Sequence, residues 1–220
     1  MGNLNDPKYR FMLIGRMGKG EDGHVIGSGL QYEEAKNLAL HYMNTWRFVE
    51  FRHYIPEQEK KMTDVVKNVI FPSEGKTFIA TYGSLRRGMQ NFRVNAGGGG
   101  EFVGLGKTVE NYDLYRYGSG AYFPSVNLTA SKSGCPVVVD VFEAPLAGLT
   151  GAYDALEGHY EKDSTANFYN RTQVEIEMED GSFLKAWIYH IDEDQGDANR
   201  VESGDWCLHN RPNYYNELPE

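Results

Sequence analysis

The stretch Tyr82–Gly88 reads Tyr-Gly-Ser-Leu-Arg-Arg-Gly and combines residue types that can bind an anion. It follows the apolar, partly β-branched run 77–81, which predicts a strand. Gly83 lets a ligand approach the main chain closely, and successive main-chain N–H groups in such a turn can converge on one negative charge. We therefore expect the loop Tyr82–Leu85 to hold a carboxylate or a phosphate. The alternative is an ordinary turn with exposed arginines.

A second candidate for chemistry is the carboxylate of Glu157, which stands at the end of a predicted helix, just before Gly158. Its neighbours Leu156 and Tyr160 suggest an apolar, tyrosine-lined pocket. Burial raises the pKa of a carboxyl group because it disfavours the charged form, and such a group can take up and return a proton near neutral pH. The alternative is a solvated helix glutamate or a capping residue.

Other motifs give weaker signals. The segment 104–108 is similar to a phosphate-binding loop, but Glu101 stands where that motif needs its first glycine. The glycines of the segment 15–23 lack the spacing of a dinucleotide-binding loop and indicate a flexible hairpin loop. The six histidines show no metal-ligand spacing. Ser84 has no identifiable base, so we expect it to bind an anion rather than to act as a nucleophile.

Composition limits the classes of function. The 220-residue chain is 40% hydrophobic and 24% charged, which is typical of a globular protein. Its net charge of −9 disfavours binding to nucleic acid, which needs a basic surface. Two distant cysteines, Cys135 and Cys207, fit a reducing compartment. No apolar run has transmembrane length and no secretion signal is recognised, so we expect a cytoplasmic protein without a membrane partner.

The first third of the chain predicts a small α+β domain, residues 1–72. The pattern favours a strand over 8–16, a helix over 32–44 and a strand over 46–54. The charged segment 56–68 predicts a linker with at most a short helix.

From residue 73 to residue 220, strands are predicted at short intervals, with one helix over 149–159. This pattern is typical of a small, mostly antiparallel β-barrel with short helices, so the whole chain is α+β. The glycine run within 95–100 predicts a mobile loop. The predicted strands cover 77–82, 102–109, 112–118, 135–143, 172–178 and 183–190.

Several motifs together resemble the gamma-glutamylcyclotransferase-like family over residues 76–207. Tyr82–Gly88 resembles the family's opening motif, and the segment 154–158, Asp-Ala-Leu-Glu-Gly, is similar to its signature around the catalytic glutamate. The arginine pair with Gly88 is most similar to the gamma-glutamylamine cyclotransferase branch. Phe92 and Tyr153 depart from that pattern. Further similar segments are 117–124, 135–143, 169–174, 186–189 and 203–206.

The resemblance implies a reaction on a small gamma-glutamyl molecule. The α-amine of the glutamyl group attacks its own γ-carbonyl, so that 5-oxoproline and a free amine are released, with Glu157 as general acid and base. No metal or cofactor is implied. Tyr82 would close the pocket. The implied substrate-binding residues are Tyr82, Gly83, Ser84, Leu85 and Tyr169.

Two other readings stay open from the sequence. One is a binding module on the same fold, which holds a small anionic ligand in the Tyr82–Leu85 loop without turnover. The other is an interaction protein that uses Trp46, Phe48 and Phe51 of the first domain, although such aromatic residues are more often core. The sequence leaves open the amine, the role of residues 1–72 and the oligomeric state.

Overall fold

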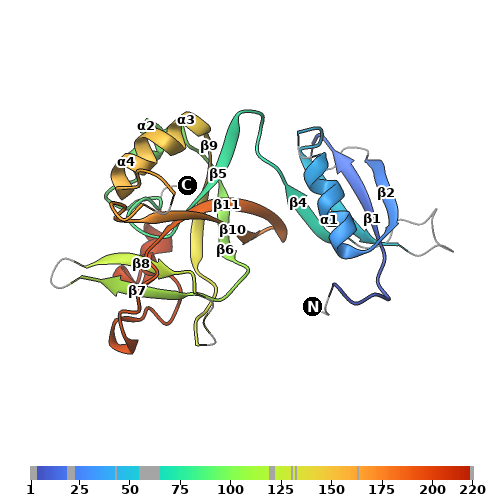
Figure 1. The fold of residues 1–220 in the computed structure, drawn as a ribbon. Coiled ribbons are helices and arrows are strands. Elements are labelled where there is room, and N and C mark those ends of the chain that lie inside the picture. The colour runs from blue at the N-terminus through green and yellow to red at the C-terminus, as the bar shows by residue number, and fades with distance from the viewer. Residues whose placement is uncertain are drawn as a thin grey trace. The chain divides into compact units, whose positions relative to one another are not determined.

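The computed structural model describes residues 4–18, 23–42, 44–54, 65–118, 122–129, 131, 133–162 and 164–218. The chain divides into two compact units (Figure 1). The first consists of Met1–Glu74 with Asp180–Leu184, and the second of Gly75–Glu179 with Lys185–Glu220. The fold is mixed α+β, mainly sheet with short helices. In the described part of the chain, no helix combines the length and the apolar character that crossing a membrane requires.

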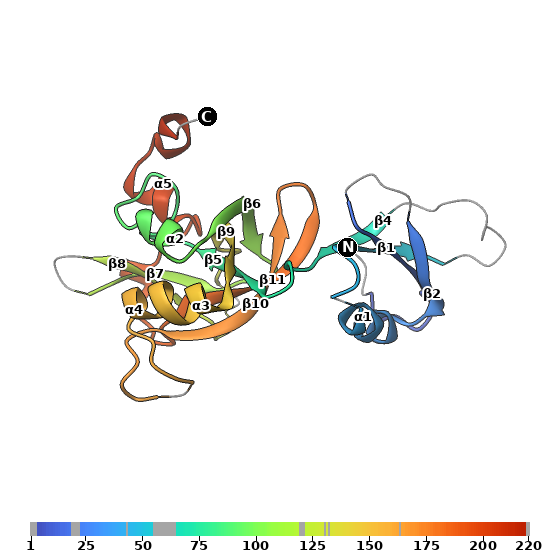
Figure 2. The same ribbon diagram turned by 90° about the horizontal axis from the view of Figure 1, so that it is seen from above.

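The first unit is a sheet in the order β2-β1-β3-β4 with one helix against it (Figure 2). Neighbouring strands of this order are antiparallel. The first residues of β11 pair in parallel with β4, Ser182 opposite Asn68. The elements are β1 (Phe11–Arg16), β2 (His24–Leu30), α1 (Tyr32–His41), β3 (Phe48–His53), β4 (Val65–Ile70) and β11 (Ser182–His190).

The side chains that alternate to one face of the strands form the core of this unit. Phe11 and Leu13 of β1 and Val49 and Phe51 of β3 pack against Ala35 and other apolar residues of α1. The helix begins as predicted and ends at His41, three residues earlier than expected. Since Phe51 lies in this core, it is not part of a docking surface.

One strand of the first unit was missed, and one prediction is wrong in part. The missed strand is β2, whose antiparallel pairing with β1 agrees with the predicted hairpin at 15–23, of which residues 15–16 belong to β1 and 19–22 lie outside the described residues. Of the predicted linker 56–68, residues 56–64 lie outside them, but 65–70 form β4. The β-branched run in 65–70 carries the strand signal, which the preceding charged residues obscured. The boundary at residue 72 stays a prediction.

The second unit has five strands in the order β10-β6-β9-β5-β11, and β10 also pairs with β11. β5 pairs in parallel with β11 and antiparallel with β9. A separate hairpin of β7 and β8 lies beside them, its two strands side by side in both views (Figure 1 and Figure 2). The strands are β5 (Lys76–Thr81), β6 (Glu101–Thr108), β7 (Asp113–Tyr117), β8 (Phe123–Asn127), β9 (Val138–Pro145) and β10 (Asn170–Met178).

The helices of the second unit are short. The predicted helix 149–159 is a helical run in three pieces, which ends at Glu157 because Gly158 takes a left-handed conformation with φ 63°. The pieces are α3 (Leu146–Gly148), the π-helical turn Leu149–Tyr153 and α4 (Asp154–Glu157). The others are α2 (Arg93–Gly97), α5 (Trp206–Asn210) and the 3₁₀ turns Asp197–Asn199 and Tyr214–Glu217.

The glycine run is not the mobile loop that the sequence predicts. It ends α2 and lies against the π-helical turn. A Cβ on Gly98 would stand 2.6 Å from the ring of Tyr153, and one on Gly100 would stand 2.4 Å from its hydroxyl oxygen. A Cβ on Gly148 would stand 1.9 Å from the carbonyl oxygen of Gly98. The glycines are therefore required by the close approach of the helical segment that ends at Glu157.

Candidate functional site

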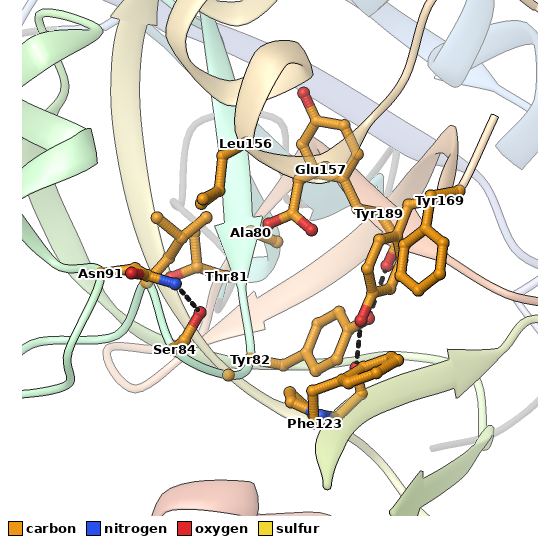
Figure 3. Close-up of a pocket in the computed structure, with 14 residues that line it drawn as sticks. Ala80, Thr81, Tyr82, Ser84, Asn91, Phe123, Leu156, Glu157, Tyr169 and Tyr189 are labelled. Carbon is orange, nitrogen blue, oxygen red and sulfur yellow. Dashed lines mark hydrogen bonds between the residues drawn. The ribbon is translucent and has the colours of Figure 1, made fainter. Parts of the chain in front are cut away.

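A cavity of about 180 Å³ lies within the second unit, at the end of β5 (Figure 3). Strands β5, β8 and β11, helix α4 and the residues just before β10 all contribute to its lining. Cavities for drug-sized ligands are about 300–1,000 Å³, so this one suits a small molecule or one end of a larger one. It brings together all six site residues predicted from the sequence: Tyr82, Gly83, Ser84, Leu85, Glu157 and Tyr169.

Glu157 is the carboxylate of this cavity. Its side chain points between Ser84 and Asn91 on one side and Phe123 and Tyr169 on the other (Figure 3). The residue is half-buried, and burial raises the pKa of its carboxyl group to about 7. Among the described residues, no side chain or amide donates a hydrogen bond to this carboxylate. A carboxyl group with such a pKa can exchange a proton near neutral pH.

The helix that carries Glu157 is fixed by the buried Asp154 at its other end. Nη1 of Arg171 lies 2.9 Å from both oxygens of Asp154. The hydroxyl of Tyr189, a residue that lines the cavity, donates to Asp154 Oδ1 at 2.6 Å. These charge-assisted bonds tie α4 to β10 and β11 and so orient Glu157.

The Tyr82–Leu85 loop forms the side of the cavity nearest β5. A Cβ on Gly83 would stand 2.2 Å from Cγ of Pro124, so the close approach of the opposite wall requires glycine here. The carbonyl of Gly83 accepts from the Arg86 amide at 3.0 Å. In the described part of the chain, the main-chain N–H groups of Gly83, Ser84 and Leu85 donate no hydrogen bond. They retain the capacity to bind an anion.

Asn91 is a cavity residue that the list of predicted site residues missed. Its Nδ2 donates to Oγ of Ser84 at 2.9 Å, and its amide donates to the Ser84 carbonyl at 2.9 Å (Figure 3). Because the Ser84 oxygen accepts from Asn91, its own hydroxyl hydrogen is left for a ligand. The sequence signal was the asparagine seven residues after the serine, but its function depends on how the turn closes.

The hydroxyl groups of the two predicted tyrosines donate to main-chain carbonyls. The Tyr82 hydroxyl donates to the Tyr189 carbonyl at 2.8 Å, and the Tyr169 hydroxyl donates to the Pro124 carbonyl at 2.6 Å. Burial raises the pKa of both phenols, so both are neutral donors at physiological pH. Each oxygen keeps lone pairs that can accept a hydrogen bond from a ligand.

The arginines after the loop are not the exposed pair of the alternative reading. Arg86 is 0% exposed and Arg87 is half-buried. Nη1 of Arg86 lies 2.8 Å from Oδ1 of Asp205, and Nε of Arg87 lies 3.2 Å from Oδ2 of Asp140. Neither arginine lines the cavity. Through these ion pairs, both arginines fix the chain that directly follows the Tyr82–Leu85 loop.

Two further candidates do not belong to the cavity lining. His159, close to Glu157 in the sequence, suggests a surface histidine or, less often, a pocket residue; in the structure it is buried, its Nδ1 lies 3.1 Å from the Tyr169 carbonyl oxygen, and it does not line the cavity. Tyr160 is 75% exposed and is not among the residues that line the cavity, contrary to the expectation from the sequence. Within the described ranges, no group of three or more His, Cys, Asp or Glu side chains is placed to hold a metal ion.

Part of this chain is similar to known proteins. The family model "Gamma-glutamyl cyclotransferase, AIG2-like" matches residues 79–208. A protein of Methanocaldococcus jannaschii named "Putative gamma-glutamylcyclotransferase MJ1514" is 31% identical over 133 residues, which are 59% of this chain and 94% of that protein.

Solved structures are similar to part of the chain. An AIG2-like protein from Mus musculus is 23% identical with a TM-score of 0.46, over 56% of this chain and 82% of the mouse chain. A protein from Pyrococcus horikoshii is 22% identical with a TM-score of 0.43, over 64% of this chain and 98% of its own. The family model spans more than half of the sequence, and the chain therefore belongs to the AIG2-like gamma-glutamyl cyclotransferase family.

Proposed function

We propose that this protein is a cyclotransferase that cleaves a small gamma-glutamyl amide into 5-oxoproline and a free amine. Glu157 takes a proton from the α-ammonium group of the glutamyl part. The free α-amine attacks the γ-carbonyl carbon, and the new carbon–nitrogen bond closes a five-membered ring. The bond from this carbon to the departing nitrogen then breaks as Glu157 returns its proton to that nitrogen. The second proton of the ring nitrogen passes to the released amine, which leaves as an ammonium ion. Atoms and charges balance without a co-reactant.

The observation that carries this proposal is the position of Glu157, whose half-buried carboxylate lines the same cavity as the Tyr82–Leu85 loop. A general acid and base works best when its pKa lies near the operating pH, and burial brings the pKa of this carboxyl group to about 7. The carboxylate has no described partner that would hold it in one protonation state. A pure binding module for an anion gains nothing from a second negative charge in its pocket, so Glu157 favours catalysis.

The Tyr82–Leu85 loop supplies the orientation that an intramolecular attack needs. We assign the substrate α-carboxylate to the amides of Gly83, Ser84 and Leu85, with the Ser84 hydroxyl as a further donor. The oxygens of Tyr82 and Tyr169 can accept from the ammonium group or from the amide nitrogen of the substrate. Because the nucleophile is tethered to its target, the main task of the enzyme is to hold both ends in a reactive geometry.

We assign the substrate to gamma-glutamyl amines rather than to glutathione or gamma-glutamyl amino acids. The described residues that line the cavity include no lysine or arginine. A carboxylate on the departing amine would therefore lack a cationic partner there. The similarity of Tyr82–Gly88 to the gamma-glutamylamine branch agrees with this assignment.

We also infer that β10, β6, β9, β5 and β11 close into a small barrel, because each pairs with the next and β10 pairs with β11. Such a barrel would hold β5 and β11 rigid on two sides of the cavity. We further propose that residues 1–72 and 73–220 are separate folding domains. Cooperative heat unfolding of a 73–220 fragment would support this, and failure of that fragment to fold would contradict it.

The experiment for the function is mass-spectrometric detection of 5-oxoproline. The purified full chain is incubated separately with gamma-glutamyl amines, ε-(γ-glutamyl)lysine, gamma-glutamyl dipeptides and glutathione. We expect product from the amine class and none from Glu157→Gln, while the matched variant Glu161→Gln, at an exposed position nearby, stays active. Tight substrate binding by the native chain with no product would instead favour a binding module.

A further inference from the structure

We infer that the departing amine is aromatic or arylalkyl and carries no carboxylate, and that it binds against a wall formed by Tyr117, Phe123 and Phe168. This inference rests on the proposed function, since it concerns the part of the substrate that leaves the same cavity. We call these three residues the aromatic wall. Phe123 and Phe168 line the cavity, and Tyr117 extends the wall outward from it.

The aromatic wall is continuous. The ring centroids of Tyr117 and Phe123 lie 5.1 Å apart, and those of Phe123 and Phe168 lie 5.5 Å apart. The ring of Phe168 also lies 5.3 Å from that of the buried Tyr169. These spacings are those of favourable aromatic pairs, so the rings form one surface that runs from the interior of the cavity to solvent.

The main chain places this wall beside Glu157. The amide of Phe168 donates to the Gly158 carbonyl at 2.9 Å, and the amide of Tyr169 donates to the Glu157 carbonyl at 3.2 Å. A Cβ on Gly158 would stand 3.1 Å from Cβ of Phe168, which shows how closely the two segments approach. The aromatic wall is thus fixed to the end of α4, and the nitrogen that Glu157 protonates would carry its substituent along this surface.

The wall has apolar surface left to bury. Phe168 is 55% exposed although it lines the cavity, and Leu156, on the other side of Glu157 in the chain, is 40% exposed. A flat ring on the departing amine would cover Phe168 and gain both burial and an aromatic contact. A small aliphatic amine such as methylamine would leave that surface in water.

The charge around the wall disfavours a carboxylate on the amine. The outer end of the wall is acidic, because the Tyr117 hydroxyl donates to Oε2 of Glu193 at 3.0 Å. Glu157 is at the inner end, and the described lining residues include no lysine or arginine. An amino acid as the departing group would place its carboxylate between these two acidic side chains without a cation to pair with.

The test compares three substrates with primary-amine leaving groups: gamma-glutamyl benzylamide, gamma-glutamyl methylamide and gamma-glutamylphenylalanine. We expect kcat/KM for the benzylamide to exceed that for each of the others by about tenfold or more. Phe168→Ala should reduce the benzylamide-to-methylamide ratio by about five- to tenfold. The control Tyr160→Ala removes an exposed ring from the same loop and should leave the ratio unchanged.

Each remaining outcome decides against one of the two proposals. Equal kcat/KM for benzylamide and methylamide, a ratio that Phe168→Ala does not change, or preferred turnover of gamma-glutamylphenylalanine would overturn the aromatic wall as a subsite. If no substrate yields 5-oxoproline, the proposed reaction fails, and calorimetry then tests the wall alone. Glu157→Gln should bind the benzylamide more tightly than the methylamide, and the double variant with Phe168→Ala should lose that difference, whereas equal binding would reject the wall.

Discussion

Arg86 and Asp205 form a buried ion pair, with Nη1 of Arg86 2.8 Å from Oδ1 of Asp205, although the two residues are 119 positions apart in the sequence. The same Asp205 oxygen accepts from the amides of Cys207 and Leu208 and so caps α5. Nη2 of Arg86 also donates to the hydroxyl oxygen of Tyr215 at 3.0 Å. The C-terminal segment thereby fixes the position of the loop that begins at Tyr82.

The first prediction concerns this ion pair. Asp205→Ala leaves the guanidinium of Arg86 buried with Asp140 at 3.5 Å as its remaining carboxylate, and it removes the cap of α5. We expect the free energy of unfolding to fall by about 3–5 kcal/mol. Urea unfolding measures the change. Asp197→Ala breaks a solvent-exposed pair with Arg200 and should change stability by less than about 0.5 kcal/mol; equal effects of the two substitutions would contradict the assigned role of Asp205.

The second prediction concerns the pH dependence of turnover. In the proposed reaction Glu157 must be ionised to take the first proton, and burial raises the pKa of its carboxyl group to about 7. We therefore expect kcat/KM to fall about tenfold for each pH unit below this value. The measurement is the pH dependence of kcat, at saturating substrate, and of kcat/KM, at substrate concentrations far below KM. An acidic limb at the ordinary carboxyl pKa would show that Glu157 does not act from this buried environment.

The third prediction concerns stability. In the folded protein, burial raises the pKa of Glu157 from 4.5 to about 7, so the folded state binds this proton more tightly than the unfolded state. The contribution of this carboxyl group to the free energy of unfolding is therefore fully present below its pKa in the unfolded chain, and it is lost as the pH rises through about 7. Glu157→Gln removes the buried charge and should be more stable than the native chain by about 1–3 kcal/mol at about pH 8.

The stability difference should shrink as the pH falls towards about 5, where Glu157 is protonated in the folded state. Urea unfolding at both pH values gives the comparison. Glu161→Gln, at an exposed position, serves as the reference and should track the native chain at both. A constant difference between the native chain and Glu157→Gln would mean that the raised pKa is not the cause.

The fourth prediction concerns Asn91, which holds the Ser84 oxygen. Asn91→Ala frees the Ser84 hydroxyl to rotate, and we expect KM to rise about fivefold with a smaller effect on kcat, equivalent to about 1 kcal/mol. Asn91→Asp converts the donor to an acceptor, so the Ser84 hydroxyl turns towards it and KM rises further. Steady-state kinetics separates the two constants. Unchanged KM in both variants would exclude Ser84 as a substrate donor.

The fifth prediction concerns Gly83. Gly83→Ala places a methyl group 2.2 Å from Cγ of Pro124, across the cavity, so the two walls must separate. We expect a loss of about 1–3 kcal/mol in the free energy of unfolding together with reduced turnover. Gly151→Ala, in a position where an added Cβ meets no atom within 4 Å, should be neutral or slightly stabilising. Thermal unfolding and the 5-oxoproline assay measure both effects.

Local patterns were sufficient to predict much of the second unit. The strand signals in the sequence predicted β5, β6, β9, β10 and β11 to within a few residues. The signal is clearest for β5 and β9, which are buried along most of their length. Strand β8 was missed, since Pro124 within the segment demotes a strand and the segment pairs with β7 alone in the described part of the chain. The order of short motifs was enough to indicate Glu157 and the Tyr82–Leu85 loop.

Features that depend on contacts between residues far apart in the sequence could not be predicted from the sequence. The burial of Arg86 depends on Asp205, and the orientation of Glu157 depends on Asp154 meeting Arg171 and Tyr189. Asn91 acts on Ser84 through the closure of a turn, which composition does not report. Sequence reasoning therefore identified which residue types were present at the site, but not which side chains are bound to each other and which remain available.

Because the glycine run lies so close to Tyr153, the size of residues 98 and 100 determines how closely the helical run that ends at Glu157 can approach. The π-helical turn leads directly into α4, so any added methyl group that pushes Tyr153 outward shifts the carboxylate four residues later in the chain. Variants with a single small side chain along this run would thus move the Glu157 carboxylate without substituting any residue that lines the cavity. Substitutions at these glycines are therefore a way to adapt the cavity to a bulkier departing amine in the proposed reaction.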